Sequence, residues 1–183
     1  MIATKNNSAQ QIAERAIVIT RFFNAPRSRV FKAWTEPKIV MRWWSPTDFT
    51  SPFCTIDLRV GGVFHHCLCS SKGKYYWSKH VYRQIREPES LVCTDTFCDE
   101  NGNIVSPKQY GLNDWPNETL IAVTFDDYDG KTKLNLQHFP VPQSRESDMC
   151  RQGWNECFDK LVDYLAKGSY ETNDTDQNES RSY

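Results

Sequence analysis

Residues 149–165, MCRQGWNECFDKLVDYL, are the stretch that decides the fold. Apolar residues recur in it at alternating spacings of one and three, so they line one face of an α-helix of about five turns. This stripe consists of Met149, Cys150, Gly153, Trp154, Cys157, Phe158, Leu161, Val162 and Leu165. Ser144 or Ser147 is the predicted N-cap, and Gly168 the predicted end. A helix with one apolar face needs a second surface against which to bury it.

That surface is predicted to be a β-sheet, because most of the preceding chain has strand character. Runs that alternate apolar and polar residues, or are rich in β-branched and aromatic ones, are separated by glycine-containing turn signals such as Asn101-Gly102 and Asp129-Gly130. The predicted strands are residues 16–23, 53–59, 63–69, 75–86, 91–97, 119–126 and 132–139. Two short helices, from 26 to 34 and from 37 to just before Pro46, follow the first strand.

These elements predict one α+β domain. Consecutive hairpins build an antiparallel sheet, and the long terminal helix is the one element large enough to cover a face of it. We therefore expect a helix-grip fold, a curved antiparallel sheet of about seven strands around the helix, over residues 14–167. Residues 1–13 and 168–183 are polar and aperiodic and are expected to be disordered. Residues 104–116 are interpreted as a loop or insertion between strands.

Composition excludes several classes of protein. The chain has 183 residues and a net charge of −1, which argues against a general nucleic-acid or anionic-membrane surface. It has no window of about 18 apolar residues and no signal-peptide pattern, so a cytoplasmic location is expected. Its seven cysteines form no C-x-x-C pair, and most are expected to be buried free thiols. No cofactor motif is present, and no cofactor is expected.

Several short motifs, taken in order, resemble one family. They are RFFNAP (21–26), VFKAWT (30–35), RWWSP (42–46), DLRVGG (57–62), EPESLV (87–92), GKTKL (130–134) and GWNECFDKL (153–161). Together they resemble the family named after the activator of heat-shock-protein-90 ATPase, within the START-like (SRPBCC) superfamily. The resemblance covers residues 14–167. It implies a helix-grip fold with an internal cavity, whereas function is not implied by fold.

The candidate ligand site is built from bulky aromatic and imidazole side chains on elements that meet in such a fold. Its residues are Trp43, Trp44, His66, Trp77, Phe125, His138, Trp154 and Phe158. For each aromatic residue, core filling is the simpler interpretation, but a curved sheet and a helix rarely pack without a gap. A solidly packed interior would contradict a cavity. His66 and His138 are also candidate general bases, although no nucleophile motif accompanies them.

Two further patterns point to structure rather than to chemistry. His65, Cys67 and Cys69 share one face of a predicted strand, but they span roughly 13 Å, too far for one zinc ion. No metal site is therefore predicted. Asp57 and Arg59 are a possible acid–base pair, and an exposed ion pair that stabilises a hairpin is the favoured interpretation.

Three functions remain open from the sequence. The first is binding of a hydrophobic or aromatic small molecule in an internal cavity, without catalysis. The second is a co-chaperone or protein-interaction module acting on a heat-shock chaperone. The third is a cyclase- or hydrolase-like enzyme that uses cavity residues, and a non-catalytic role is favoured over it. A homodimer is possible, and would be isologous.

Overall fold

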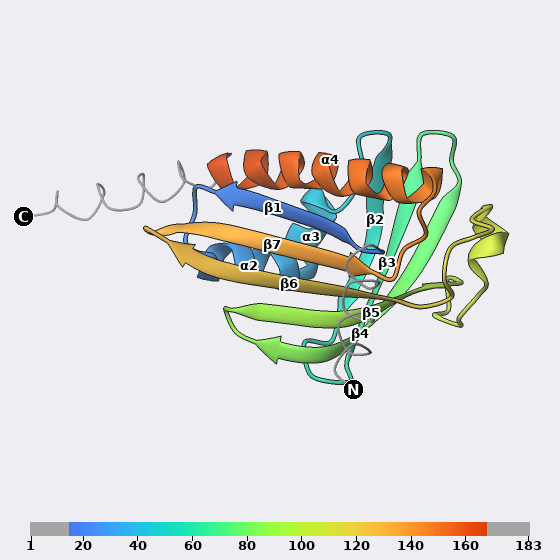
Figure 1. Ribbon diagram of the computed structural model, residues 1–183, viewed down its shortest axis with the longest axis horizontal. Helices are drawn as coiled ribbons and strands as arrows, with labels where there is room; N and C mark the ends of the chain where they lie inside the picture. The colour runs from blue at the N-terminus through green and yellow to red at the C-terminus, as the bar shows by residue number, and fades with distance from the viewer. Residues whose placement is uncertain (1–14, 168–183) are drawn as a thin grey trace, which may run out of the picture.

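Seven strands form one antiparallel sheet in the order β1-β7-β6-β5-β4-β3-β2 (Figure 1). The computed structural model describes residues 15–167, and the predicted tails 1–13 and 168–183 lie outside the described residues. The strands are β1 (Ile17–Phe23), β2 (Phe49–Ile56), β3 (Val63–Ser70), β4 (Tyr75–Arg86), β5 (Ser90–Cys98), β6 (Thr119–Tyr128) and β7 (Lys131–Phe139). The helices are α2 (Arg27–Thr35), α3 (Pro37–Trp43), the short 3-10 helix η1 (Pro107–Tyr110) and α4 (Arg145–Lys167).

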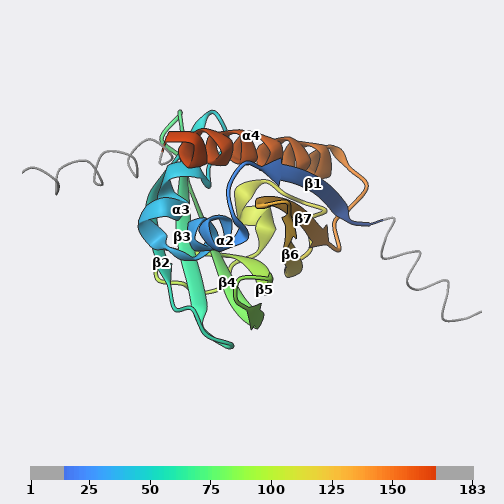
Figure 2. The ribbon, with the colours of Figure 1, turned by 90° about the vertical axis from the view of Figure 1, so that its left-hand side faces the viewer.

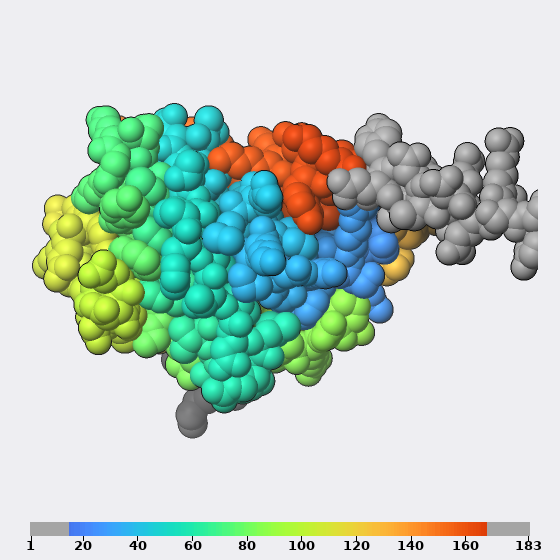
Figure 3. Space-filling view, turned by 180° about the vertical axis from the view of Figure 1, so that it is seen from behind, coloured from blue at the N-terminus to red at the C-terminus, as the bar shows by residue number. Residues whose placement is uncertain are grey.

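The sheet curves around the helices, and the predicted α+β helix-grip fold is confirmed. In Figures 1 and 2, α4 lies across the opening of the curved sheet, and α2 and α3 occupy one end of it. Figure 3 shows α3 and α4 side by side at the surface. Lys160 of α4 connects this helix to the segment that follows α3. Its ammonium group donates to Oγ of Ser45 (3.0 Å) and to the carbonyl of Pro46 (2.9 Å).

The start of the sheet differs from the prediction. β2 covers Phe49–Ile56 rather than residues 53–59, so Asp57 and Arg59 lie in the turn that follows it. The chain turns there because the amide of Arg59 bonds to the carbonyl of Asp57 and Gly61 takes a φ of 80°, which favours glycine. The predicted exposed ion pair is present, with Nε of Arg59 2.8 Å from Oδ2 of Asp57.

The segment between β5 and β6 is a loop that contains η1, in agreement with the prediction for residues 104–116. Tyr110 fixes this loop to the sheet. Its hydroxyl donates to the carbonyl of Cys98 (2.8 Å) and accepts from the amide of Trp77 (3.3 Å). The loop therefore has a defined position at the end of the sheet near the start of α4 (Figure 1).

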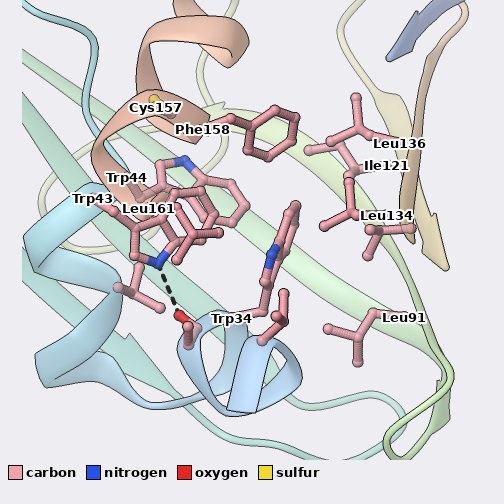
Figure 4. Packing of buried hydrophobic residues seen from close by; sticks show 14 of the residues in the cluster. Trp34, Trp43, Trp44, Leu91, Ile121, Leu134, Leu136, Cys157, Phe158 and Leu161 are labelled. Atoms are coloured by element: carbon pink, nitrogen blue, oxygen red, sulfur yellow. Dashed lines mark hydrogen bonds between the residues drawn. The ribbon is translucent and has the colours of Figure 1, made fainter. Parts of the chain in front are cut away.

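An aromatic core fills the space between the helices and the sheet. Trp34 of α2 lies among these side chains, next to Trp43 and Trp44 (Figure 4). Its ring centroid is 5.1 Å from those of Trp43 and Trp44 and 6.0 Å from that of Trp154. The indole N–H of Trp43 is satisfied by the carbonyl of Ala33 at 2.9 Å, drawn as the dashed line in Figure 4. Large aromatic side chains in contact with one another pack densely. Among the described residues, the indole N–H of Trp34 has no hydrogen-bond partner.

The apolar stripe of α4 is confirmed in its middle and corrected at two positions. Trp154, Cys157, Phe158, Leu161 and Leu165 are buried, whereas Met149 and Val162 are 59% and 40% exposed. The helix begins at Arg145, so Ser144 precedes it and Ser147 lies in its first turn. Met149 and Val162 lie at the margins of the apolar stripe, because the stripe is wider than the part of the helix that packs against the sheet.

The two edge strands of the sheet are β1 and β2. The guanidinium group of Arg151 on α4 donates to the carbonyl of Val18 in β1 at 3.1 Å, and Arg21 of β1 pairs with Asp159. At the opposite edge, β2 contains Pro52, and its pairing with β3 shifts register between Thr50 and Phe53.

Candidate functional site

The concave face of the sheet has an apolar end and a polar end. The apolar end holds a void of about 10 Å³, room for about one water molecule, so the ligand-sized internal cavity that the resemblance implied is not open at this position. Its lining residues are Trp34, Trp44, Phe64, Tyr82, Leu91, Cys93, Ile121 and Val123. Moving two residues along β4 and β5 leads from Tyr82 and Cys93 to His80 and Asp95, because every second residue of a strand faces the same side. Apolar and polar surfaces therefore adjoin on one face.

Asp95 is the centre of the polar end. Its Oδ1 lies 3.5 Å from Nδ1 of His80, and its Oδ2 lies 3.4 Å from Nε2 of His138. Thr119 links the second pair, with its Oγ1 2.7 Å from that Nε2 and 3.3 Å from Oδ2 of Asp95. Three neighbouring strands, β5, β6 and β7, supply this network, with β4 adding His80.

The charges of this cluster favour an ionised carboxylate. Burial alone would raise the pKa of Asp95, but the charge interaction with His80 and the hydrogen bond and charge of His138 outweigh it and lower that pKa to about 2. Burial would likewise lower the pKa of His138, but the hydrogen bond to Asp95 and the contact with Cys150 raise it to about 10. Asp95 is thus an anion, with its side chain 18% exposed, that polarises the ring of His138.

Burial opposes protonation of two other histidines on this face. Burial lowers the pKa of His66 to about 3, assisted by the charge of His80, and burial also lowers the pKa of His80. His66 accepts or donates one hydrogen bond, between Nδ1 and Oγ of Ser78 at 3.0 Å. Within residues 15–167, Nε2 of His66 and both ring nitrogens of His80 have no hydrogen-bond partner. Buried polar atoms are rarely left unsatisfied, so these three nitrogens need an explanation.

Aromatic rings connect the two ends of this face. Trp44, which lines the cavity, has ring centroids 5.7 Å from His66, 5.9 Å from His80 and 5.0 Å from Trp154. The rings of His66 and His80 therefore pack against Trp44, which lines the apolar cavity, although the histidines themselves are not among its lining residues.

The remaining ring nitrogen of His138 faces α4. Its Nδ1 accepts from the indole N–H of Trp154 at 3.3 Å and lies 3.6 Å from Sγ of Cys150. Trp115, from the loop after β5, packs edge-on against the same ring at 5.8 Å. His138 is thus held between the sheet, the helix and that loop.

The structure brings most of the predicted site residues together. Those on the concave side, in the core or in the polar cluster, are Trp43, Trp44, His66, Phe125, His138, Trp154 and Phe158. Trp77 is the exception and corrects the prediction. Trp77 packs against Phe53 and His65 on the opposite face of the sheet. It lies there because it pairs with Cys67, the residue next to His66 in β3, and neighbouring residues of a strand point to opposite faces.

Sequence reasoning missed His80, Asp95 and Thr119. The signal for Asp95 was available, since it is the one carboxylate in the otherwise apolar and hydroxyl-bearing run LVCTDTF. A charged residue in a buried strand needs a partner, and the strands on both sides were the places to look.

His65, Cys67 and Cys69 lie together on the outer face of β3, as their spacing predicted. Among the residues that the structure describes, no group of three or more histidine, cysteine or acidic side chains is arranged to hold a metal ion.

A curved antiparallel sheet around a long C-terminal helix, with an apolar and polar concave face, defines the START-like helix-grip class of domain. The sequence matches the family described as activator of Hsp90 ATPase homolog 1-like protein over residues 24–166. The chain belongs to this family, and the resemblance seen in the motifs is confirmed. A search of curated protein sequences found no significant match.

Solved structures agree with this fold assignment. A protein from Nitrosomonas europaea is 18% identical with a TM-score of 0.71, over 86% of this chain and 98% of its own. A protein from Chromobacterium violaceum is 20% identical with a TM-score of 0.68, over 83% of this chain and 97% of its own. The AHSA1 protein from Silicibacter pomeroyi is 18% identical with a TM-score of 0.67, over 84% of this chain and 99% of its own. At these identities the similarity concerns the fold alone.

None of the helices in residues 15–167 is both long and apolar enough to cross a membrane.

Proposed function

We propose that this domain binds a small, largely apolar or aromatic molecule carrying one polar group, on the concave face between the sheet and α4. The observation that carries the proposal is the set of unsatisfied nitrogens on His66 and His80. They are buried, and the rings that carry them pack against Trp44 and Phe64, which line the apolar cavity. Apolar walls with a few polar groups are the composition of small-molecule sites.

The position of the polar group follows from the cluster. His80 is 2% exposed, and its ring stacks on Phe64 with centroids 4.6 Å apart. A hydroxyl or carbonyl group placed beside it satisfies a ring nitrogen, while the apolar part of the ligand occupies the cavity next to Trp44 and Tyr82. A neutral polar group suits this position better than a carboxylate, because the partly buried anion Asp95 would repel a second negative charge.

The cavity must enlarge for this function. A volume of about 10 Å³ admits one water molecule, so a ligand has to displace aromatic side chains or the α3 region. Trp34 and Trp44 line the cavity and are the side chains expected to move. Ligand binding should therefore change tryptophan fluorescence, which provides a signal that does not depend on the identity of the ligand.

The first experiment is native mass spectrometry of the purified protein, followed by a thermal-shift screen with fatty acids, sterols, flavonoids and polyketides. A co-purified mass, or a melting temperature that rises with ligand concentration, is the expected result. The matched variants are His80→Phe and His65→Phe, which make the same change on opposite faces of the sheet. His80→Phe should weaken a hit about tenfold, the effect of losing one hydrogen bond, and His65→Phe should not.

The alternative is a protein-interaction module acting on a heat-shock chaperone, which the family description favours. A protein that is free of ligand, shows no shift with any compound and co-purifies with a chaperone would replace the ligand proposal with this one. The native mass also reports whether the protein is a homodimer.

A further inference from the structure

Cys150 lies where a nucleophile would stand in a three-residue relay. Its Sγ is 3.6 Å from Nδ1 of His138, and the other ring nitrogen of His138 is 3.4 Å from Oδ2 of Asp95. Thiol, imidazole and carboxylate thus follow one another across α4, β7 and β5. A nucleophile beside a base, with the base oriented by a third group, is the recurring arrangement of covalent catalysis.

The hydrogen bonds around His138 support the tautomer that a base requires. Asp95 and Thr119 contact Nε2, which places the ring proton there as a donor. Trp154 directs its indole N–H at Nδ1 (3.3 Å), and indole can only donate, so Nδ1 carries a lone pair. This lone pair faces the thiol of Cys150, and the raised pKa of His138 favours transfer of the thiol proton to Nδ1, which leaves a thiolate beside an imidazolium.

The other cysteines provide an internal comparison. Cys54, Cys67, Cys93, Cys98 and Cys157 are buried, whereas Cys69 and Cys150 are partly exposed. Burial raises the pKa of the Cys157 thiol to about 12, which makes it inert. Sγ of Cys69 contacts the carbonyl of Ser70 at 3.6 Å and no imidazole nitrogen. Cys69 and Cys150 therefore share partial exposure and differ in having a neighbouring base.

We propose that Cys150 is a nucleophile that accepts an acyl group from an activated ester or thioester, with His138 as its base and Asp95 as a positioning residue. The thiol proton moves to Nδ1 of His138 as Sγ attacks the acyl carbon. The carbon–oxygen or carbon–sulfur bond to the leaving group then breaks, and the leaving alcohol or thiol takes that proton back from His138. The products are an S-acyl cysteine and a free alcohol or thiol, so no oxidant or metal is needed.

The surroundings favour an acyl group with an apolar chain. The rings of Trp115 and Trp154 flank His138, and the ring of Trp154 also contacts that of Trp44 at the cavity. The inference goes beyond the proposed ligand binding, because it needs a thiol adduct and not a stable complex. A protein that binds no ligand reversibly is still able to pass the test below.

The test is acylation of the wild-type protein by p-nitrophenyl butyrate at pH 6.5. One equivalent of p-nitrophenolate should be released, and peptide mass mapping should find the butyryl group on Cys150. Cys69 contacts a carbonyl instead of an imidazole that could take its proton, so it should react at least about tenfold more slowly than Cys150. This comparison is internal to one folded protein and needs no variant.

Variants separate the roles. Cys150→Ser should remove the fast phase of p-nitrophenolate release and leave only the slow reaction of Cys69, and Cys69→Ser should leave the fast phase unchanged. Asp95→Asn should slow acylation of Cys150 at pH 6.5 at least tenfold and bring its dependence of rate on pH close to that measured for Cys69. A mere loss of fold would instead expose every cysteine. Equal rates at the two cysteines, or the same pH dependence at both in the wild-type protein, would overturn the proposal.

Discussion

Replacing Phe158 by alanine should remove about 3–5 kcal/mol of stability. This side chain is fully buried in the middle of α4, and its ring centroid lies 5.7 Å from Trp154, 6.0 Å from Phe23 and 6.2 Å from Trp34. The loss combines the hydrophobic transfer of the ring with the cavity that remains, because neighbours held by other contacts collapse only partly. For a protein of this length it corresponds to a fall in melting temperature of about 10 °C.

Urea denaturation followed by circular dichroism measures this loss, and an unchanged dependence on urea shows that the two proteins unfold alike. Met149→Ala is the matched control, since Met149 belongs to the same apolar stripe but is largely exposed. Its replacement should cost less than about 0.5 kcal/mol. If Phe158→Ala cost less than about 1 kcal/mol, or if Met149→Ala cost as much, the assignment of the packed face of α4 would be refuted.

Two further predictions concern the hairpin and the histidines. Gly62→Ala should cost about 2 kcal/mol or more of stability, because a Cβ there would lie 2.1 Å from the carbonyl oxygen of Asp57. Gly61→Ala meets no atom within 4 Å and should cost about 1 kcal/mol, through its positive φ. Equal losses of stability in thermal melts of the two variants would contradict this. Stability should fall as pH drops from about 6.5 towards 3, since burial holds the pKa of His66 at about 3 and only the neutral ring suits the fold. His66→Gln should reduce this loss of stability between pH 6.5 and 4. Asp95, with its pKa lowered to about 2, stays ionised over that range and does not contribute to the change. Identical pH profiles of stability for the two proteins would show that His66 is not responsible.

Much of the architecture was predictable because it depends on local periodicity. The alternation in β4 and the three-and-four spacing in α4 predicted both elements, and the turn glycines located the hairpins between them. The end of β2 was not predictable from alternation. Residues 53–59 continue a strand pattern, but the contacts that bend the chain at Asp57 involve Val63 and Gly62 beyond it.

The candidate site was only half predictable, for a reason that concerns register. His66 and His138 stood out by residue type, but their partners are placed by pairing between strands. The register of the β3–β4 hairpin decides which residue of β4 lies opposite His66 and whether Trp77 points to the same face as His66. A slip of one residue in that register would move every side chain of the strand to the other face. The relation of Cys150 to His138 depends further on how α4 docks, which no local pattern encodes.

The two edges of the sheet also limit how copies of this protein can meet. Open strand edges are templates for strand addition, and here Arg151 occupies a carbonyl of β1 while Pro52 and a register shift interrupt β2. A continuous sheet running from one molecule into the next is therefore disfavoured at both ends. Fibril growth should be correspondingly slow, and any dimer should form through helices, loops or the convex face instead.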